Sequence, residues 1–217
     1  MSSGKLSLKI IKEFPIIEKI SFELLIEAYR KSVKNTQYDL DWEEDQFTNY
    51  LINFMRESKL NRIYPLDIVP QYPLLQNDLP IDSNYPKTLP IIDIRICNWK
   101  SENQKEYFFE AKNLSEKNWY KKSGAKVDAS SSQRRYIKTG IENFRTGRYY
   151  NGSLIGYILE GEIVIIIDKL NGRLIKDETN VKLIEKVDYI KDFSYFYESL
   201  HSQESKELKI KHIFLKF

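Results

Sequence analysis

Cysteine and histidine are scarce in this sequence. Among its 217 residues there is one cysteine, Cys97, and there are two histidines, His201 and His212. A single cysteine excludes an internal disulfide, and so few thiol and imidazole groups exclude a cysteine-rich zinc site. Any catalytic metal would therefore be held mainly by carboxylates, which favours a hard ion such as Mg²⁺ or Mn²⁺.

Long apolar runs and glycine-rich loops are also missing. No apolar run reaches the roughly 18 residues of a membrane-spanning helix, and the opening stretch MSSGKLSLKI lacks the apolar segment of a signal peptide. The sequence therefore predicts a cytoplasmic protein that does not associate with membranes. No phosphate loop of the P-loop or dinucleotide type is present. A hydrophobic content of 41% suits a single α/β domain over 1–217.

The charges nearly balance, with 34 basic and 31 acidic residues, but they are unevenly distributed. The segment 117–148 carries nine basic and two acidic residues, interleaved with aromatic residues. Such a stretch is typical of a surface that neutralises phosphates, although a solvated helix face has the same composition. The expected contacts with a nucleic-acid backbone are Lys121, Lys122, Arg134, Arg135 and Lys138, with Tyr149 and Tyr150 as further candidates.

The first half of the chain contains two predicted helices. Apolar residues at helical spacing predict a helix over 15–34, beginning at Pro15. A second helix is expected over 41–60, because Asp41 and the residues after it fit a variant of the capping box. The proline-rich stretch 61–90 predicts a short strand over 62–69 and then an extended loop.

Two segments with period-two alternation follow. The first puts Ile92, Ile94 and Ile96 on one face of a strand and Asp93 on the other. The second, over 107–112, puts Glu110 and Lys112 on the face opposite Phe109 and Ala111. A turn around 100–104 would make these strands antiparallel neighbours, so that Asp93 lies beside Glu110.

The second half of the chain alternates between helices and strands. A helix capped by a serine cluster is expected over 131–148, and a strand over 152–160. The segment 162–174 contains a β-branched run that suits a strand, but its apolar residues keep helical spacing, so we predict a helix. A hairpin formed by 193–201 and 208–217 would bring His201 and His212 toward one region of its sheet.

Asp93, Glu110 and Lys112 form the constellation that points to chemistry. Two carboxylates held close together repel each other unless a cation lies between them, and Mg²⁺ accepts one or two carboxylates together with phosphate oxygens and waters. A nearby lysine can orient or deprotonate a metal-bound water and stabilise charge on a phosphate. The three residues therefore predict catalysis of phosphodiester hydrolysis, with a surface hairpin and an incidental salt bridge as the alternative.

The stretch Pro90-Ile91-Ile92-Asp93 followed by Phe108-Phe109-Glu110-Ala111-Lys112 resembles the motif of the PD-(D/E)xK nuclease superfamily, which includes restriction endonucleases. The expected order of elements over approximately 41–160 is similar to that superfamily's αβββαβ core. One departure is Ile92, because a proline often directly precedes the aspartate in the superfamily. The resemblance implies an α/β fold with a restriction-endonuclease-like core, a mixed central sheet flanked by helices, an N-terminal helix and a C-terminal extension over 161–217 that carries the hairpin.

The resemblance also implies an activity and its partners. It implies a metal-dependent endonuclease that cleaves double-stranded DNA with Mg²⁺, for which Mn²⁺ would substitute, in bacterial phage defence, restriction or mobile-element biology. Glu44 would join Asp93 and Glu110 as a metal ligand, with Glu43 as the fallback, although an acid in a first helical turn is favourable by itself. The alternatives are a catalytically silent module of the same fold that binds nucleic acid or a partner, or an RNA- or structure-specific nuclease. A homodimer or a defence-operon helper protein would complete the assembly.

Overall fold

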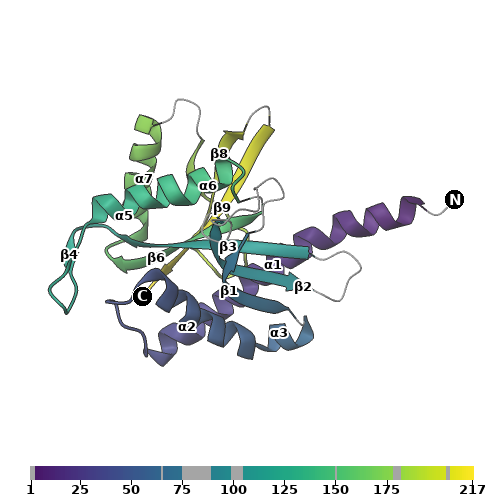
Figure 1. Cartoon of the computed structure of the whole chain (residues 1–217), viewed down its shortest axis with the longest axis horizontal. Helices are drawn as coiled ribbons and strands as arrows, with labels where there is room; N and C mark the ends of the chain where they lie inside the picture. The colour runs from purple at the N-terminus through teal and green to yellow at the C-terminus, as the bar shows by residue number, and fades with distance from the viewer. Residues whose placement is uncertain are drawn as a thin grey trace, which may run out of the picture.

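The structure is a computed structural model of the chain, and it describes residues 3–64, 66–74, 89–98, 105–149, 151–177, 182–203 and 206–217. For residues 3–16, 177, 182, 202, 203 and 206 it describes the backbone alone. Helices cover both faces of a central mixed sheet (Figure 1). The helices are α1 Ser3–Asn35, α2 Glu44–Glu57, α3 Lys59–Ile63, α5 Ala129–Arg135, the π-helix η1 Tyr136–Ile141, α6 Glu142–Arg145 and α7 Ile163–Asp177. The sheet strands are β1 Asp67–Pro73, β2 Ile91–Asn98, β3 Lys105–Ser115, β6 Gly152–Glu160, β7 Lys182–Lys186, β8 Phe196–Gln203 and β9 Lys206–Lys216.

The seven strands of the sheet lie in the order β1-β2-β3-β6-β9-β8-β7. Strand β6 lies in the middle and runs parallel to β3 on one side and to β9 on the other, while the outer pairs are antiparallel. Seven consecutive residues of β6 are buried, as expected for a strand covered on both faces. A separate hairpin of β4 Trp119–Tyr120 and β5 Lys126–Val127 follows β3 and projects away from the sheet (Figure 1).

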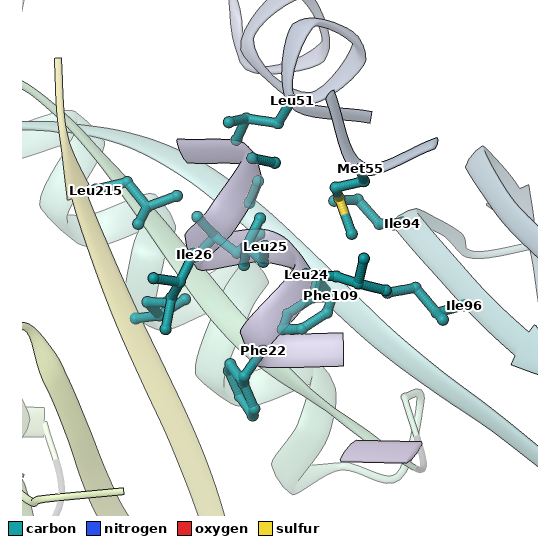
Figure 2. Packing of buried hydrophobic residues seen from close by; sticks show 14 of the residues in the cluster. Phe22, Leu24, Leu25, Ile26, Leu51, Met55, Ile94, Ile96, Phe109 and Leu215 are labelled. Atoms are coloured by element: carbon teal, nitrogen blue, oxygen red, sulfur yellow. The ribbon is translucent and has the colours of Figure 1, made fainter. Parts of the chain in front are cut away.

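Two hydrophobic clusters lie on the two faces of this sheet. On one face, α1 and α2 contribute Phe22, Leu25 and Leu51, which pack with Phe109 and Leu215 of the strands (Figure 2). On the other face, the second cluster draws mainly on η1, α7 and the sheet. Among the described helices, none is both long and apolar enough to cross a membrane.

Several predicted elements are confirmed. Strand β6 has the predicted bounds, and the ambiguous segment is the helix α7 because Ile163, Ile166 and Leu170 form one buried stripe. The predicted terminal hairpin is the antiparallel pair β8–β9. In β3 the expected alternation holds, since Phe109 and Ala111 pack in the first cluster and Phe108 in the second.

Predicted helix starts were less accurate. Helix α1 begins at Ser3 rather than Pro15, because a proline removes one backbone hydrogen bond while its φ still suits a helix. The second helix begins at Glu44, where the backbone N–H of Glu43 donates to Oε1 of Gln46, and it breaks at Ser58 before α3. The helix expected over 131–148 begins at Ala129 and reaches only Arg145, with a π-helical centre.

The expected helix caps and the first strand were also displaced. The carboxylate of Asp128, rather than the serine cluster, caps α5 by accepting from the N–H of Ser131 at 2.6 Å. The first strand is β1 over 67–73 instead of 62–69, because the residues at 62 and 63 belong to α3. The expected turn at 100–104 lies among residues that the structure does not describe.

The segment 161–217, expected as a C-terminal extension of the core, contributes three strands to the central sheet. Strand β9 pairs with β6 from Ser153↔Lys211 to Ile158↔Lys216, and β8 and β7 extend the sheet beyond it. Because β6 is covered on both edges, the segment 161–217 completes the central sheet.

Candidate functional site

The pairing of β2 with β3 is interrupted at Asp93. Regular pairing ends at Ile94↔Phe109, and continuing that register would put Ile92 opposite Ala111. Instead, Oδ2 of Asp93 accepts a hydrogen bond from the N–H of Ala111 at 2.7 Å. The Asp93 carboxylate is thus bonded to the backbone of Ala111, the residue that follows Glu110 in β3.

This interruption corrects the predicted alternation in β2. Ile94 and Ile96 pack in the first cluster as expected, but Ile92 packs in the second, with Phe108. The prediction that Asp93 lies opposite Ile92 assumed an unbroken period of two. The period-two alternation of β2 fails at Asp93, where the side-chain carboxylate, instead of a backbone carbonyl of β2, accepts the hydrogen bond from β3.

Gln71 holds the other oxygen of Asp93. Its side-chain amide donates to Oδ1 of Asp93 at 2.8 Å, from a position in β1 that is 22 residues earlier. Gln71 has a φ of 47°, which is in the left-handed region that side chains other than glycine rarely adopt. Sequence analysis placed it in a proline-rich loop, and no local signal pointed to this contact.

Lys112 and Glu110 form a buried hydrogen-bonded pair on one face of β3. The Lys112 ammonium donates to Oε1 of Glu110 at 2.5 Å and to the carbonyl oxygen of Ala111 at 2.9 Å. Glu110 is 5% exposed and Lys112 is 7% exposed. Among the described residues, Oε2 of Glu110 is buried without a hydrogen-bond partner, so this carboxyl group is only half satisfied there.

Glu44 approaches the same lysine from α2. Its Oε2 lies 3.9 Å from the Lys112 ammonium. Its Oε1 accepts from the backbone N–H of Asn113 at 3.0 Å and from the Arg135 guanidinium at 2.6 Å. The inward orientation predicted for Glu44 is therefore observed, and α2, β3 and α5 meet at this carboxylate.

Burial and mutual repulsion change the acid–base properties of the pair. Burial, followed by the neighbouring charge of Asp93, raises the pKa of Glu110 from 4.5 to about 8 against the opposing effect of Lys112. For Lys112, burial opposes the charged form, but the attraction of Glu110, Glu44 and Asp93 outweighs it and raises the pKa. One ammonium therefore serves three carboxyl groups and stays charged, while Glu110 binds a proton near neutral pH.

The donor set fits a hard divalent cation. Mg²⁺ requires one or two carboxylates and takes its remaining ligands from water and phosphate, and Asp93 and Glu110 are close enough to interact electrostatically. The partnerless Oε2 of Glu110 and its raised pKa are both expected where a cation is needed between carboxylates. Within the described residues, no group of three or more His, Cys, Asp or Glu side chains is gathered as a metal site, and the role of Glu44 as a third ligand stays a prediction.

The predicted backbone-binding residues divide into two groups. Lys121 bonds to the carbonyl of Asp41 and to the Glu43 carboxylate, and Lys122 pairs with Asp39 at 2.7 Å. These two lysines therefore hold the β4–β5 hairpin against the segment before α2, and Glu43 is a partner of Lys121. Arg135 binds Glu44, whereas Arg134 and Lys138 line a groove beside α7.

The aromatic residues of this region are mostly buried. Tyr149, a candidate DNA contact, is buried, and its hydroxyl donates to the carbonyl of Ile91 at 3.0 Å. Tyr136 is buried against His212, with its hydroxyl 2.8 Å from Nδ1. Tyr150 lies outside the described residues. Tyr136 and Tyr149, which lie in the basic stretch of the sequence, thus belong to the second hydrophobic cluster.

His201 and His212 meet as the hairpin prediction required. Nε2 of each ring lies 2.7 Å from Oγ of Ser199, so one hydroxyl links both histidines. Burial lowers the pKa of His201 to about 4 and that of His212 to about 3, with a smaller contribution from Arg145 and from His201 respectively. Both rings are therefore neutral near pH 7 and belong to a buried hydrogen-bond network rather than to the carboxylate site.

Comparison with known proteins adds no relative. No protein-family model matches the chain, and neither a curated protein nor a solved structure matches it.

Proposed function

We propose that this protein is a divalent-metal-dependent nuclease that hydrolyses phosphodiester bonds of DNA, with Asp93, Glu110 and Lys112 as its catalytic residues. The observation that carries the proposal is the buried, half-satisfied Glu110 beside Asp93 and Lys112 at the point where β2 and β3 separate. The order α2-β1-β2-β3-α5-β6 agrees with the αβββαβ core of the PD-(D/E)xK superfamily. The resemblance of the motif supports a role in bacterial defence or restriction, in the cytoplasm.

The protein side chains have distinct roles in this proposal. Asp93 and Glu110 would hold Mg²⁺, with Mn²⁺ as a substitute, and the bound ion would supply a more acidic water and neutralise phosphate charge. Asp93 is fixed by donors from Gln71 and Ala111, so its carboxylate is positioned before a cation arrives. Lys112 is a buried cation that can orient a water and stabilise negative charge on the phosphate.

Glu44 and Arg135 act as positioning residues. From the start of α2, Glu44 attracts the Lys112 ammonium, and the Arg135 guanidinium donates to Glu44 and holds it in place. If Glu110 held a divalent ion, Glu44 would remain as a second anionic partner for the lysine. This keeps the charge of Lys112 inside the site, where it is needed during hydrolysis.

Two variants test the roles of Asp93 and Lys112 separately. Asp93→Asn keeps an acceptor for the Ala111 N–H but removes a metal-binding charge, so cleavage of supercoiled plasmid DNA should be lost. Lys112→Ala keeps both carboxylates and should slow cleavage by roughly a hundredfold or more. Lys19→Ala, in an exposed part of α1, is the matched control and should cleave like the wild type. Each protein is assayed with Mg²⁺, with Mn²⁺ and with a chelator.

The outcome distinguishes an enzyme from a binding module. If Lys112→Ala cleaves as fast as wild type while remaining folded, the catalytic assignment is wrong. If the wild type binds DNA but never cleaves DNA or RNA with either metal, a catalytically silent module of the same architecture replaces the nuclease. Cleavage of RNA alone would change the substrate class but leave the residue roles unchanged.

A further inference from the structure

A wide cationic groove lies on the side of α5 away from Glu44. It has a volume of about 920 Å³ and runs between α5–η1 and α7, closed at one end by the segment that follows β3. Its walls carry six basic side chains and a single acidic one, Glu116. The basic residues are Lys117, Arg134, Lys138, Lys169, Arg173 and Lys176.

Half of these cations form a row along α7. Lys169, Arg173 and Lys176 recur at i, i+4 and i+7, which puts them on one face of the helix. Seven residues of helix rise about 10 Å, and phosphates of one DNA strand follow one another at about 3.4 Å along the duplex axis. The length of the row is therefore similar to that of about three successive phosphates of one strand. A single phosphate group could not contact all of it.

One of these cations, Arg173, is already held in position by hydrogen bonds. The Arg173 guanidinium donates to Ser130 at 2.8 Å and to Gln133 at 3.4 Å, and Gln133 is itself buried and donates to the carbonyl of Ser115. Arg173 thus has no carboxylate partner in these contacts. Within the part of the chain that the structure describes, no ion pair neutralises Arg134 or Lys176. An anion in the groove would relieve the repulsion among these charges.

The lining favours a phosphate backbone over a base. The residues that line the groove include no aromatic side chain on which a base could stack. At the centre of the α7 wall is Gly172, and a Cβ added there would meet no atom within 4 Å. The groove is therefore open at its middle and charged along its edges, as suits a polymer of phosphodiesters read without regard to sequence.

The groove is close to the candidate catalytic site. Arg134 faces the groove and its neighbour Arg135 faces Glu44, so one turn of α5 contributes to both. Along β3, Glu116 follows Lys112 by four residues, a distance of about 13 Å. A strand whose phosphate lies at Lys112 would reach the groove about four nucleotides away.

We infer that the groove between α5–η1 and α7 binds the phosphodiester backbone of the nucleic acid on which the carboxylate–lysine site acts, as a second contact surface outside that site. This inference rests on the proposed function for its substrate. It assigns to α7 a row of contacts with the nucleic-acid backbone, and these contacts bind the substrate without taking part in its cleavage.

Binding to a labelled DNA duplex, measured by fluorescence anisotropy in chelator at several salt concentrations, tests the groove separately from catalysis. Arg134→Glu with Lys176→Glu should weaken binding at least tenfold and make the slope of log affinity against log salt shallower by about two, at roughly 0.9 for each lost phosphate contact. The matched control, Lys34→Glu with Lys191→Glu, changes the net charge equally at exposed positions outside the groove and should lose much less affinity.

A second pair of variants tests the groove without changing charge. Gly172→Leu should fill the middle of the groove and weaken binding, whereas Gly172→Ala should bind like wild type. Equal affinities for the groove variants and their controls would overturn the inference even if the wild type cleaves DNA. Displacement of the duplex by polyglutamate at equal charge concentration would also overturn it, in favour of an acidic protein segment. If the groove variants bind weakly while no protein cleaves, the groove stands and the nuclease proposal fails.

Discussion

Glu110→Gln is the perturbation whose effect on stability follows most directly from the structure. Glutamine has the shape of a protonated glutamate, so its oxygen can still accept from Lys112 as Oε1 does. Its amide can occupy the position of Oε2, which has no hydrogen-bond partner in the part of the chain that the structure describes. The variant therefore resembles the wild type with Glu110 protonated. The two proteins differ at pH values at which Glu110 of the wild type has lost its proton.

The pH dependence of this difference has a definite sign. Burial, followed by the charge of Asp93, raises the pKa of Glu110 from 4.5 to about 8, so the folded protein keeps a proton that the unfolded chain releases. That stabilisation is fully present below pH 4.5 and is lost progressively as the pH rises to about 8. At 1.36 kcal/mol for each pKa unit, the loss amounts to roughly 5 kcal/mol. Glu110→Gln has no such loss.

The assay compares free energies of unfolding in urea, with a chelator present, from pH 4.5 to pH 8.5. Variant and wild type should be similar at the acid end, and the variant should become more stable by roughly 1.4 kcal/mol for each pH unit above it. In the variant Lys112 loses the attraction of Glu110 but keeps that of Glu44 and Asp93, which also raise its pKa and favour its charged form. Parallel stability curves for the two proteins would refute the assigned protonation of Glu110.

Mg²⁺ should act on wild type alone. A cation that binds the folded protein stabilises it by about 2.7 kcal/mol at a hundredfold excess over its dissociation constant. Because binding requires ionised Glu110, this stabilisation should grow between pH 6 and pH 8 and be weak or missing in Glu110→Gln. Equal stabilisation of both proteins would mean that the ion binds elsewhere.

Two further predictions concern backbone positions. Gly152→Ala should destabilise the protein by more than about 2 kcal/mol, because the added Cβ would lie 2.3 Å from the carbonyl oxygen of Phe108 in β3. In the same thermal unfolding assay, the matched Gly172→Ala should stabilise the protein by about 0.5 to 1 kcal/mol. Gln71→Gly relieves a left-handed backbone and removes a donor to Asp93, so unfolding free energy should change by less than about 1 kcal/mol while plasmid cleavage falls severalfold; unchanged cleavage would mean that Gln71 does not position Asp93.

Local sequence patterns were sufficient to predict the elements that bury one continuous stripe of side chains. Helix α7 could be distinguished from a strand because its apolar residues recur at helical spacing over fifteen residues. The faces of β3 followed from alternation alone, and with them the side on which Glu110 and Lys112 lie. The candidate residues of β3 were thus predictable because their orientation depends on nearest neighbours in the chain.

Contacts between distant segments were not predictable in this way. The approach of Glu44 to Lys112 depends on how α2 packs across the sheet, and the pairing of Lys122 with Asp39 depends on a hairpin 83 residues away. Charge pattern alone made Lys121 and Lys122 candidates for phosphate binding, because a sequence gives the sign of a charge but not its neutralising partner. For the same reason the basic row on α7 was overlooked, since its charges gather with those of α5 only in the folded protein.

The C-terminal strands matter to the candidate site through the helix that follows β3. Arg135 fixes Glu44, and the next residue, Tyr136, bonds to His212 of β9, which Ser199 links to His201. The lowered pKa values of about 3 and 4 keep both rings neutral down to well below pH 6.5, so the link between helix and sheet does not change charge where Glu110 titrates. For these histidines the sign is opposite to that of Glu110: their contribution to stability is full above pH 6.5 and is lost as the pH falls toward their folded values. Since wild type and Glu110→Gln share this loss, it cancels in their difference and leaves the titration of Glu110 as the quantity measured.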